Sequence, residues 1–157
     1  MKDIFYQESF SFINREDSKL RTYGKVKTNI GIEKYLLSNL KIDERTCITK
    51  LRLSNHDLMI EKGRHQNIHK SQMFCPFCPD QIETEEHFLL QCRQYTYFRN
   101  DLFLNITDLF PSFLTLPENE RFTCLLNNEK LINILGIHLL RTFNCRKFLI
   151  ENHKNPL

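Results

Sequence analysis

The sequence has no tryptophan, few residues that break helices and no long apolar run. Its 157 residues include only four glycines and five prolines, which leaves little room for a turn-rich β-sandwich, and its thirteen phenylalanines indicate an aromatic core. A membrane-spanning helix needs about 20 consecutive apolar residues, and no stretch approaches that length. These absences predict a soluble, mostly helical protein with no membrane partner.

The amino-terminal segment lacks the features of a secretory signal. The stretch MKDIFYQESFSF carries charges at Lys2, Asp3 and Glu8 and has no uninterrupted apolar core. We therefore expect an intracellular chain, nuclear or cytoplasmic, whose cysteines stay reduced.

Apolar residues recur at helical spacing along most of the chain. The pattern predicts a mainly α fold, a small helical bundle with an embedded zinc knuckle-like motif. Helices are expected at 29–40, 95–104 and 118–126. Two further helices are expected from their end signals: one begins at Asp43 as N-cap and ends at Gly63, and the last begins at Asn128 as N-cap and runs to about Ile150. The last has a wide apolar face and is expected to be the central core helix, or in part a docking surface. The expected regions are a loosely attached arm (1–18), a basic helical region (19–70), a zinc-binding module with its following helix (71–107) and a C-terminal helical region (108–157).

Four residues in the middle of the chain have the spacing of a zinc site. Cys75, Cys78, His87 and Cys92 form the pattern Cys-x2-Cys-x8-His-x4-Cys. Zn²⁺ prefers four soft or borderline ligands in a tetrahedron, and three thiolates with one imidazole supply them. Because four protein ligands leave no position for an activated water, we expect a structural rather than a catalytic ion.

Two other interpretations of these cysteines are open. Six cysteines are an even number and could form disulfides, and Cys75 and Cys78 could form a thioredoxin-like redox pair. A reducing compartment disfavours the first interpretation, and the lack of a βαβ pattern around Cys75 disfavours the second.

The spacing of the last two ligands conflicts with a regular helix. Thr84 is expected to cap a helix with an acidic first turn, which places His87 on that helix. Cys92 follows five residues later, about 140° around an ideal helix. The helix is therefore expected to loosen near Gln91, or the chain to turn there.

Charge is distributed unevenly along the chain. Residues 1–70 contain 14 Lys and Arg against 9 Asp and Glu, whereas residues 71–107 contain 2 against 5. Because Glu83, Glu85 and Glu86 lie beside the three thiolates, we expect a nucleic-acid partner to meet the basic half rather than the metal loop. The candidate phosphate contacts are Lys50, Arg52, His56, Lys62 and Arg64. An ordinary solvated surface is the alternative interpretation of these residues.

The other histidines and cysteines do not indicate a second site. His65 and His69 have His-x3-His spacing in a polar connector and are expected at the surface, with an extra metal site as the alternative. Cys47, Cys124 and Cys145 occur on apolar faces and are expected to pack as small hydrophobic residues.

Residues 19–103 resemble the region that follows the polymerase domain in LINE-like, non-LTR retrotransposon reverse transcriptases. The segments that carry the resemblance are LRTYGKVKT, ITKLRLSNHDLMIEKGRH, FCPFC, IETEEHFLLQC and YTYFRNDLF. The Cys/His set alone is common to many zinc modules, and the segment KLRLSNHDLMIEKGR before it makes the match more specific. The resemblance implies that the four Cys/His residues bind zinc. It also implies that the segment helps bind RNA or DNA next to the polymerase core of a related element.

The chain lacks the residues of the polymerase itself. Polymerase chemistry needs clustered carboxylates that hold two metal ions; the family presents them in an aromatic-x-Asp-Asp box, and no Asp-Asp pair occurs here. We therefore expect a non-catalytic, zinc-stabilised nucleic-acid-binding module, the C-terminal fragment of a retrotransposon protein. A zinc-stabilised protein-interaction or scaffold module is the alternative. A zinc-dependent nuclease is the third alternative, and it would need an open coordination position on the metal, which a set of four protein ligands does not leave.

Overall fold

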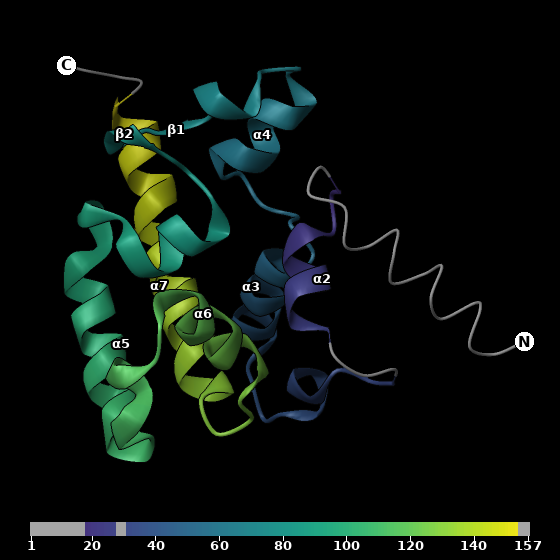
Figure 1. The fold of residues 1–157 in the computed structure, drawn as a ribbon, viewed down its shortest axis with the longest axis vertical. Coiled ribbons are helices and arrows are strands. Elements are labelled where there is room, and N and C mark those ends of the chain that lie inside the picture. Colours follow the sequence, from purple (N-terminus) through teal and green to yellow (C-terminus); the bar gives the residue numbers. More distant parts are fainter. Residues whose placement is uncertain (1–17, 28–30, 154–157) are drawn as a thin grey trace, which may run out of the picture.

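The structure, a computed structural model, describes residues 18–27 and 31–153. This part of the chain is mainly α-helical with one two-stranded sheet, which confirms the expected fold class (Figure 1). The helices are α2 (Arg21–Val26), α3 (Ile42–Arg52), α4 (Met59–His65), α5 (Thr96–Leu109), α6 (Glu118–Asn127) and α7 (Ile132–His153). The short segments Lys34–Leu37, Lys70–Gln72, Arg93–Tyr95 and Pro111–Thr115 are 3-10 helical, and His87–Gln91 is π-helical. Apart from Ser18, the arm expected at 1–18 lies outside the described residues.

Helix α7 is the central helix of the core. It packs along α3 and α5 and also contacts α6 (Figure 1). Leu135 and Leu139, one turn apart, are fully buried, in agreement with the expected place of this helix in the core. Where α7 crosses α3, a Cβ on Gly136 would lie 2.7 Å from Leu40 Cδ2 and 3.2 Å from Glu44 Cβ. The absence of a side chain at Gly136 therefore permits the close approach of the two helices.

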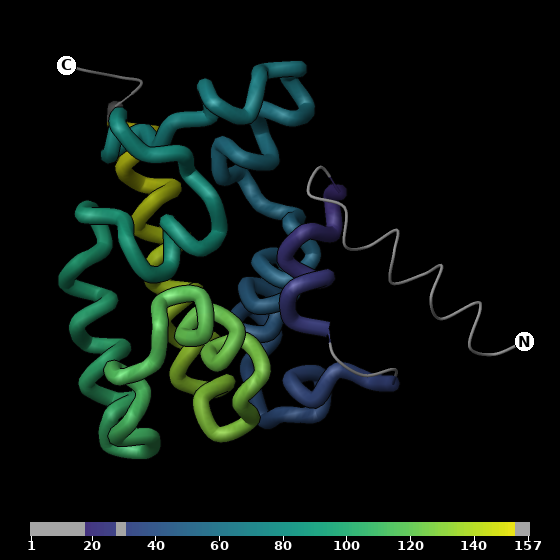
Figure 2. Tube along the Cα trace, viewed as in Figure 1, coloured from purple at the N-terminus to yellow at the C-terminus, as the bar shows by residue number. Residues whose placement is uncertain are grey.

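The β-hairpin is tied to this helical core by a buried ion pair. Strands β1 (Phe74–Cys75) and β2 (Cys78–Ile82) pair antiparallel. The turn between them lines a groove together with the C-terminal part of α7, and the path of both segments can be followed in Figure 2. Directly after β2, Glu83 accepts hydrogen bonds from Arg146 Nε and Nη2 at 2.9 and 2.8 Å. The main-chain N–H of Met59 donates to the same carboxylate at 2.6 Å. Because both charged side chains are buried, hairpin and helices share one core.

Prolines lie at helix bounds in the C-terminal half. Helix α5 ends at Leu109, two residues before Pro111, and α6 begins directly after Pro117. Asn128, expected to cap the last helix, does not do so. Its side-chain oxygen instead accepts from the main-chain N–H of Lys130, in the turn before α7.

The expected helices of the N-terminal half are wrong in three respects. Residues 31–40 contain only the 3-10 turn Lys34–Leu37 instead of a helix over 29–40. The helix expected from Asp43 to Gly63 is two helices, because the chain turns at Ser54 with a φ of 49° in the left-handed region. Lys41 precedes α3 as its N-cap, and Asp43 lies in the first turn.

Gly63 lies inside α4 rather than stopping the helix. A Cβ at this position would lie 2.8 Å from the Cγ atom of Met73, which is buried. The glycine is therefore explained by close packing against Met73 and not by the left-handed conformation of a helix C-cap.

Candidate metal centre

The hairpin turn brings the first two cysteines together. Cys75 ends β1 and Cys78 begins β2, and the two face each other in the strand register. Pro76 and Phe77 form the connection between them, and the fixed φ of proline limits the conformations that this turn can adopt. The local sequence therefore places two sulfur atoms at one end of the hairpin.

A π-helical segment brings the other two ligands together. Thr84 Oγ1 accepts a hydrogen bond from the main-chain N–H of His87 at 3.0 Å, which confirms Thr84 as the expected cap. The helix then widens over His87–Gln91, and the N–H of Cys92 donates to the carbonyl of His87 at 2.7 Å. This bond spans five residues instead of four. The expected loosening near Gln91 is confirmed, and it returns Cys92 to the side of the helix that carries His87.

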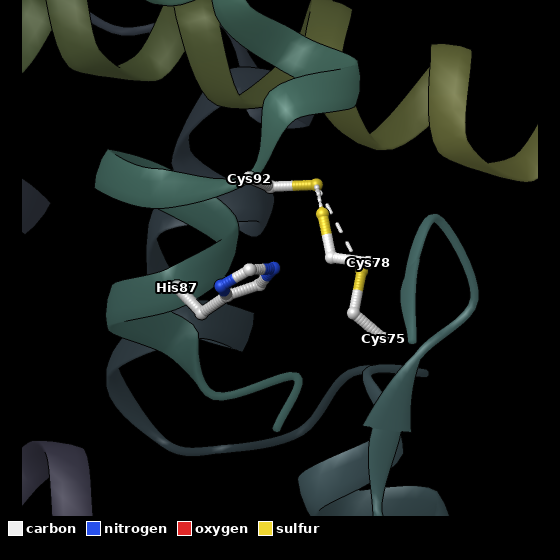
Figure 3. Close-up of side chains that lie close together, drawn as sticks. All are labelled: Cys75, Cys78, His87 and Cys92. Carbon is white, nitrogen blue, oxygen red and sulfur yellow. Dashed lines mark hydrogen bonds between the residues drawn. The ribbon is translucent and has the colours of Figure 1, made fainter. Parts of the chain in front are cut away.

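The four side chains converge in a closed, buried cluster (Figure 3). Their ligand atoms all lie within 4.8 Å of one another. Cys92 Sγ lies 3.8 Å from Cys75 Sγ and 3.8 Å from Cys78 Sγ. A disulfide needs sulfur atoms about 2.05 Å apart, and all six cysteines are free thiols. The cluster could therefore hold a metal ion, and the disulfide interpretation is not supported.

The geometry of the cluster fits a tetrahedral ion. Two thiolates bound at about 2.3 Å to one tetrahedral Zn²⁺ would lie about 3.8 Å apart, which matches the two measured distances. Both ring nitrogens of His87, Nδ1 and Nε2, are buried without a hydrogen-bond partner in the described structure. A buried polar atom without a partner is costly, and coordination of an ion by one of these nitrogens would remove part of that cost.

Electrostatics in the cluster favours a thiolate. A hydrogen bond from the Cys92 thiol is the main cause that lowers the pKa of Cys75; burial opposes this change, and His87 adds to it. The same sharing of a proton, together with burial, raises the pKa of Cys92. Since metal ligands are thiolates, the arrangement already provides part of the protonation state that an ion requires.

The acidic residues beside the cluster are neutralised by cations from elsewhere in the chain. Glu83 is paired with Arg146, and Glu85 is buried and bonded to Arg21 Nη2 at 2.5 Å. Burial would raise the pKa of Glu85, but the hydrogen bond from His56 and the charge of Arg21 outweigh it and lower that pKa to about 2. The expected surplus of negative charge around the metal loop is therefore smaller than the sequence indicated.

Two of the five candidate phosphate contacts are buried and are withdrawn. Arg52 is 2% exposed and donates to the carbonyl oxygen of Leu126 at 2.6 Å, and it also pairs with Glu33. The side chain of His56 is 1% exposed, and its Nε2 lies 3.0 Å from Glu85 Oε1. Both side chains stabilise the fold from within and do not face a phosphate chain.

The other three candidates reach the surface. Lys50 and Lys62 are exposed, and within the described residues neither ammonium group has an ion-pair or hydrogen-bond partner. Arg64 is partly exposed and pairs with Glu61 at 2.5 Å. These three residues stay predictions for nucleic-acid contact.

The other histidines and cysteines do not join a metal cluster in the described part of the chain. His65 and His69 are exposed, in agreement with the surface interpretation. Cys47 is buried, while Cys124 and Cys145 are half-buried and pack against the core.

Sequence reasoning missed one residue that supports the site. Arg99, in the first turn of α5, donates from Nη1 to the carbonyl oxygen of Cys92 at 2.9 Å. This bond holds the backbone at the last ligand. Its only sequence signal is an arginine seven residues after a cysteine, which is too common a pattern to identify it.

Comparisons of the chain with protein-family models, with curated proteins and with solved structures found no match. None of the helices in the described residues combines the length and the hydropathy needed to cross a membrane. The resemblance to LINE-like reverse transcriptases stays a prediction from the sequence segments that carry it.

Proposed function

We propose that the chain is a zinc-stabilised, non-catalytic module that binds nucleic acid, the C-terminal part of a LINE-like reverse transcriptase. The observation that carries the zinc assignment is the buried set of three thiols and one imidazole, with sulfur atoms 3.8 Å apart. This donor set suits Zn²⁺, and four protein ligands leave no place for a reactive water. A bound ion would cross-link the hairpin to the π-helical segment and act as a brace.

The surface best suited to nucleic acid is the stretch 62–72, here called the basic segment. It reads KGRHQNIHKSQ and has no acidic residue. Lys62 and Lys70 are exposed, as are both of its histidines, and Arg64 is partly exposed. Cationic side chains grouped on one stretch release counterions from a phosphate chain, which is the main source of non-specific affinity. The sequence resemblance, which spans this stretch, supports the same assignment.

The nucleic-acid part is tested by titrating labelled single-stranded RNA and DNA with the full, zinc-loaded chain at several salt concentrations. Affinity is expected to fall as salt rises from about 50 to 200 mM. The double variant Lys62→Gln with Lys70→Gln should reduce the slope of log affinity against log salt by about 1.4, which is about 0.7 for each charge on a single strand.

The matched control is Lys19→Gln with Lys130→Gln, two lysines that are also exposed but lie outside the basic segment. We expect this control to change the slope much less. Absence of binding by the unmodified chain at low salt would overturn the nucleic-acid function. An equal reduction of the slope in both double variants would overturn the assignment to the basic segment. It would not contradict the binding of nucleic acid by the chain.

A further inference from the structure

A loaded metal centre would place a net negative charge inside the protein. Three thiolates and one divalent ion leave one formal negative charge, and Cys75, Cys78 and Cys92 are at most 2% exposed. Such a charge is costly to bury unless cations lie close to it. Arg146 and Arg21 are already paired with the two buried carboxylates beside the cluster. Compensation must therefore come from other cations.

Arg99, in the first turn of α5, is one such cation. Its side chain is half-buried and donates from Nη1 to the carbonyl oxygen of Cys92 at 2.9 Å and from Nη2 to Thr96 Oγ1 at 3.0 Å. Among the described residues, no carboxylate lies within ion-pair distance of this guanidinium. Burial lowers the pKa of Arg99, and the negative charges of Cys92, Glu118 and Cys78 oppose that change. The charge of Arg99 is therefore held beside the thiolates and is not neutralised by a direct partner.

Arg93, directly after Cys92, is a second cation at the cluster. Its Nη2 donates to Asp80 Oδ1 at 3.0 Å, and Asp80 lies on β2, two residues after Cys78. The side chain therefore reaches from the π-helical half of the site to the hairpin half. A hydrogen bond to Cys78 is the main cause that raises the pKa of Arg93, and the charge of Asp80 adds to it. Because this side chain is 73% exposed, solvent and salt screen its charge, and we expect its effect to be smaller than that of Arg99.

We propose that Arg99 is the counter-ion of the metal–thiolate cluster, a positioning residue that acts on the ion through its charge, with Arg93 as a weaker second cation. The cluster and Asp80 together carry two formal negative charges, and the two arginines carry two positive ones, so the assembly is neutral. This inference rests on the zinc-binding part of the proposed function. It goes beyond that function because it makes retention of the ion depend on a residue that is not a ligand.

The first experiment measures the zinc affinity of the full chain by competition with a chromophoric chelator. Arg99→Gln retains an N–H donor but loses the charge, and it should weaken zinc binding at least about tenfold, as loss of partners around metal ligands commonly does. Arg99→Lys keeps the charge and should recover most of the affinity.

The matched control is Arg121→Gln. Arg121 is also half-buried, has no ion-pair partner in the part of the chain that the structure describes, and donates to the carbonyl oxygens of Leu116 and Leu114 at 2.8 and 2.6 Å. Because it lies outside the cluster, its loss should leave the zinc affinity unchanged. Equal weakening by Arg99→Gln and Arg121→Gln overturns the proposal.

A second variant separates the charge of Arg99 from its hydrogen bond to the backbone of Cys92. Cys78→His changes the donor set to two thiolates and two imidazoles, which Zn²⁺ also accepts and which makes the loaded cluster neutral. In this background Arg99→Gln should change the zinc affinity much less than in the unmodified chain. The same loss in both backgrounds would show that Arg99 acts through its hydrogen bond alone and overturns the proposal.

The cobalt(II) form gives a readout that does not depend on this double variant. A cation beside the thiolates lowers the energy of the sulfur electrons, so Arg99→Gln should move the sulfur-to-cobalt charge-transfer band to longer wavelength, and Arg99→Lys should not. An unmoved band in Arg99→Gln overturns the proposal while metal binding by the chain stands. If the unmodified chain binds neither zinc nor cobalt, the zinc part of the proposed function is overturned as well.

Discussion

The main-chain N–H of Cys92 donates to the carbonyl oxygen of His87 at 2.7 Å, across five residues rather than four. This bond belongs to a π-helical segment whose inner side chains, Phe88, Leu89 and Leu90, are buried. Packing of these side chains holds the wider turn, and the wider turn aligns two ligands that a regular helix would separate. Single π-helical turns are often found at functional sites for this kind of reason.

Loss of one thiol should remove the metal and much of the fold together. For Cys78→Ser we expect the zinc content to fall from about one ion per chain to almost none. The free energy of unfolding should decrease by at least about 3 kcal/mol, because structural zinc binding contributes directly to folding. Elemental analysis and denaturant titration followed by circular dichroism measure both quantities.

Cys124→Ser is the control for this substitution, since Cys124 is half-buried and lies outside the cluster. It should retain the metal. Unchanged zinc content in Cys78→Ser would remove Cys78 from the ligand set.

The buried pair of Glu83 and Arg146 should be one of the most sensitive points of the fold. Glu83→Gln leaves the Arg146 charge buried without a counter-ion and is expected to cost about 3–5 kcal/mol of unfolding free energy. For comparison, Asp101→Asn removes the 2.8 Å pair with Arg141, in which both side chains are about half exposed. That variant should lower the free energy of unfolding by less than about 1 kcal/mol. Similar losses in urea titrations of the two variants would contradict the role assigned to Glu83.

Two neighbouring cations on α3 should differ in their effect on stability. Arg52→Ala removes the side-chain donor of the Leu126 carbonyl and leaves the Glu33 carboxylate paired with Lys27 alone. We expect the free energy of unfolding to fall by about 2–3 kcal/mol. Lys50→Ala should change stability by less than about 0.5 kcal/mol, since its ammonium is exposed. Thermal or chemical denaturation distinguishes the two variants. An Arg52→Ala variant as stable as the unmodified chain would show that the contacts of Arg52 with Leu126 and Glu33 are dispensable.

The stability of the chain should decrease with acid partly through His138 on α7. Burial lowers the pKa of His138 to about 4, from the usual 6.5. Because the unfolded chain takes up this proton first, the contribution of His138 is complete above about pH 6.5 and is lost as pH falls towards 4. The difference between these two pKa values corresponds to a loss of about 3 kcal/mol in the free energy of unfolding.

The variant His138→Gln cannot take up this proton and isolates its effect. We measure the free energy of unfolding by urea titration at pH 7, 6, 5 and 4. Over this range it should fall by about 3 kcal/mol less in the variant than in the unmodified chain. Metal loss in acid affects both proteins and cancels in the comparison. Parallel pH profiles would show that His138 is not buried in its neutral form.

Features of the site that depend on neighbours in the sequence were predictable. The spacing of the four ligands, the cap at Thr84 and the need for a loosened helix near Gln91 all follow from local geometry. The break at Ser54 was not predictable, because no glycine or proline marks it and apolar spacing continues through it. Gly63 was misinterpreted because a glycine that ends a helix and one that admits a neighbouring side chain have the same sequence signal.

The sequence by itself determined the mainly helical class and the four residues of the candidate metal centre, since both depend on periodicity and on ligand chemistry at short range. Only the tertiary structure decided which charges are available at the surface. Arg52 and Lys50 lie two positions apart on one helix, yet one faces α6 and Glu33 while the other faces solvent. The reason is physical: burial of a charge depends on which segments distant in sequence pack against it, and pairs such as Glu83 with Arg146 join residues 63 positions apart.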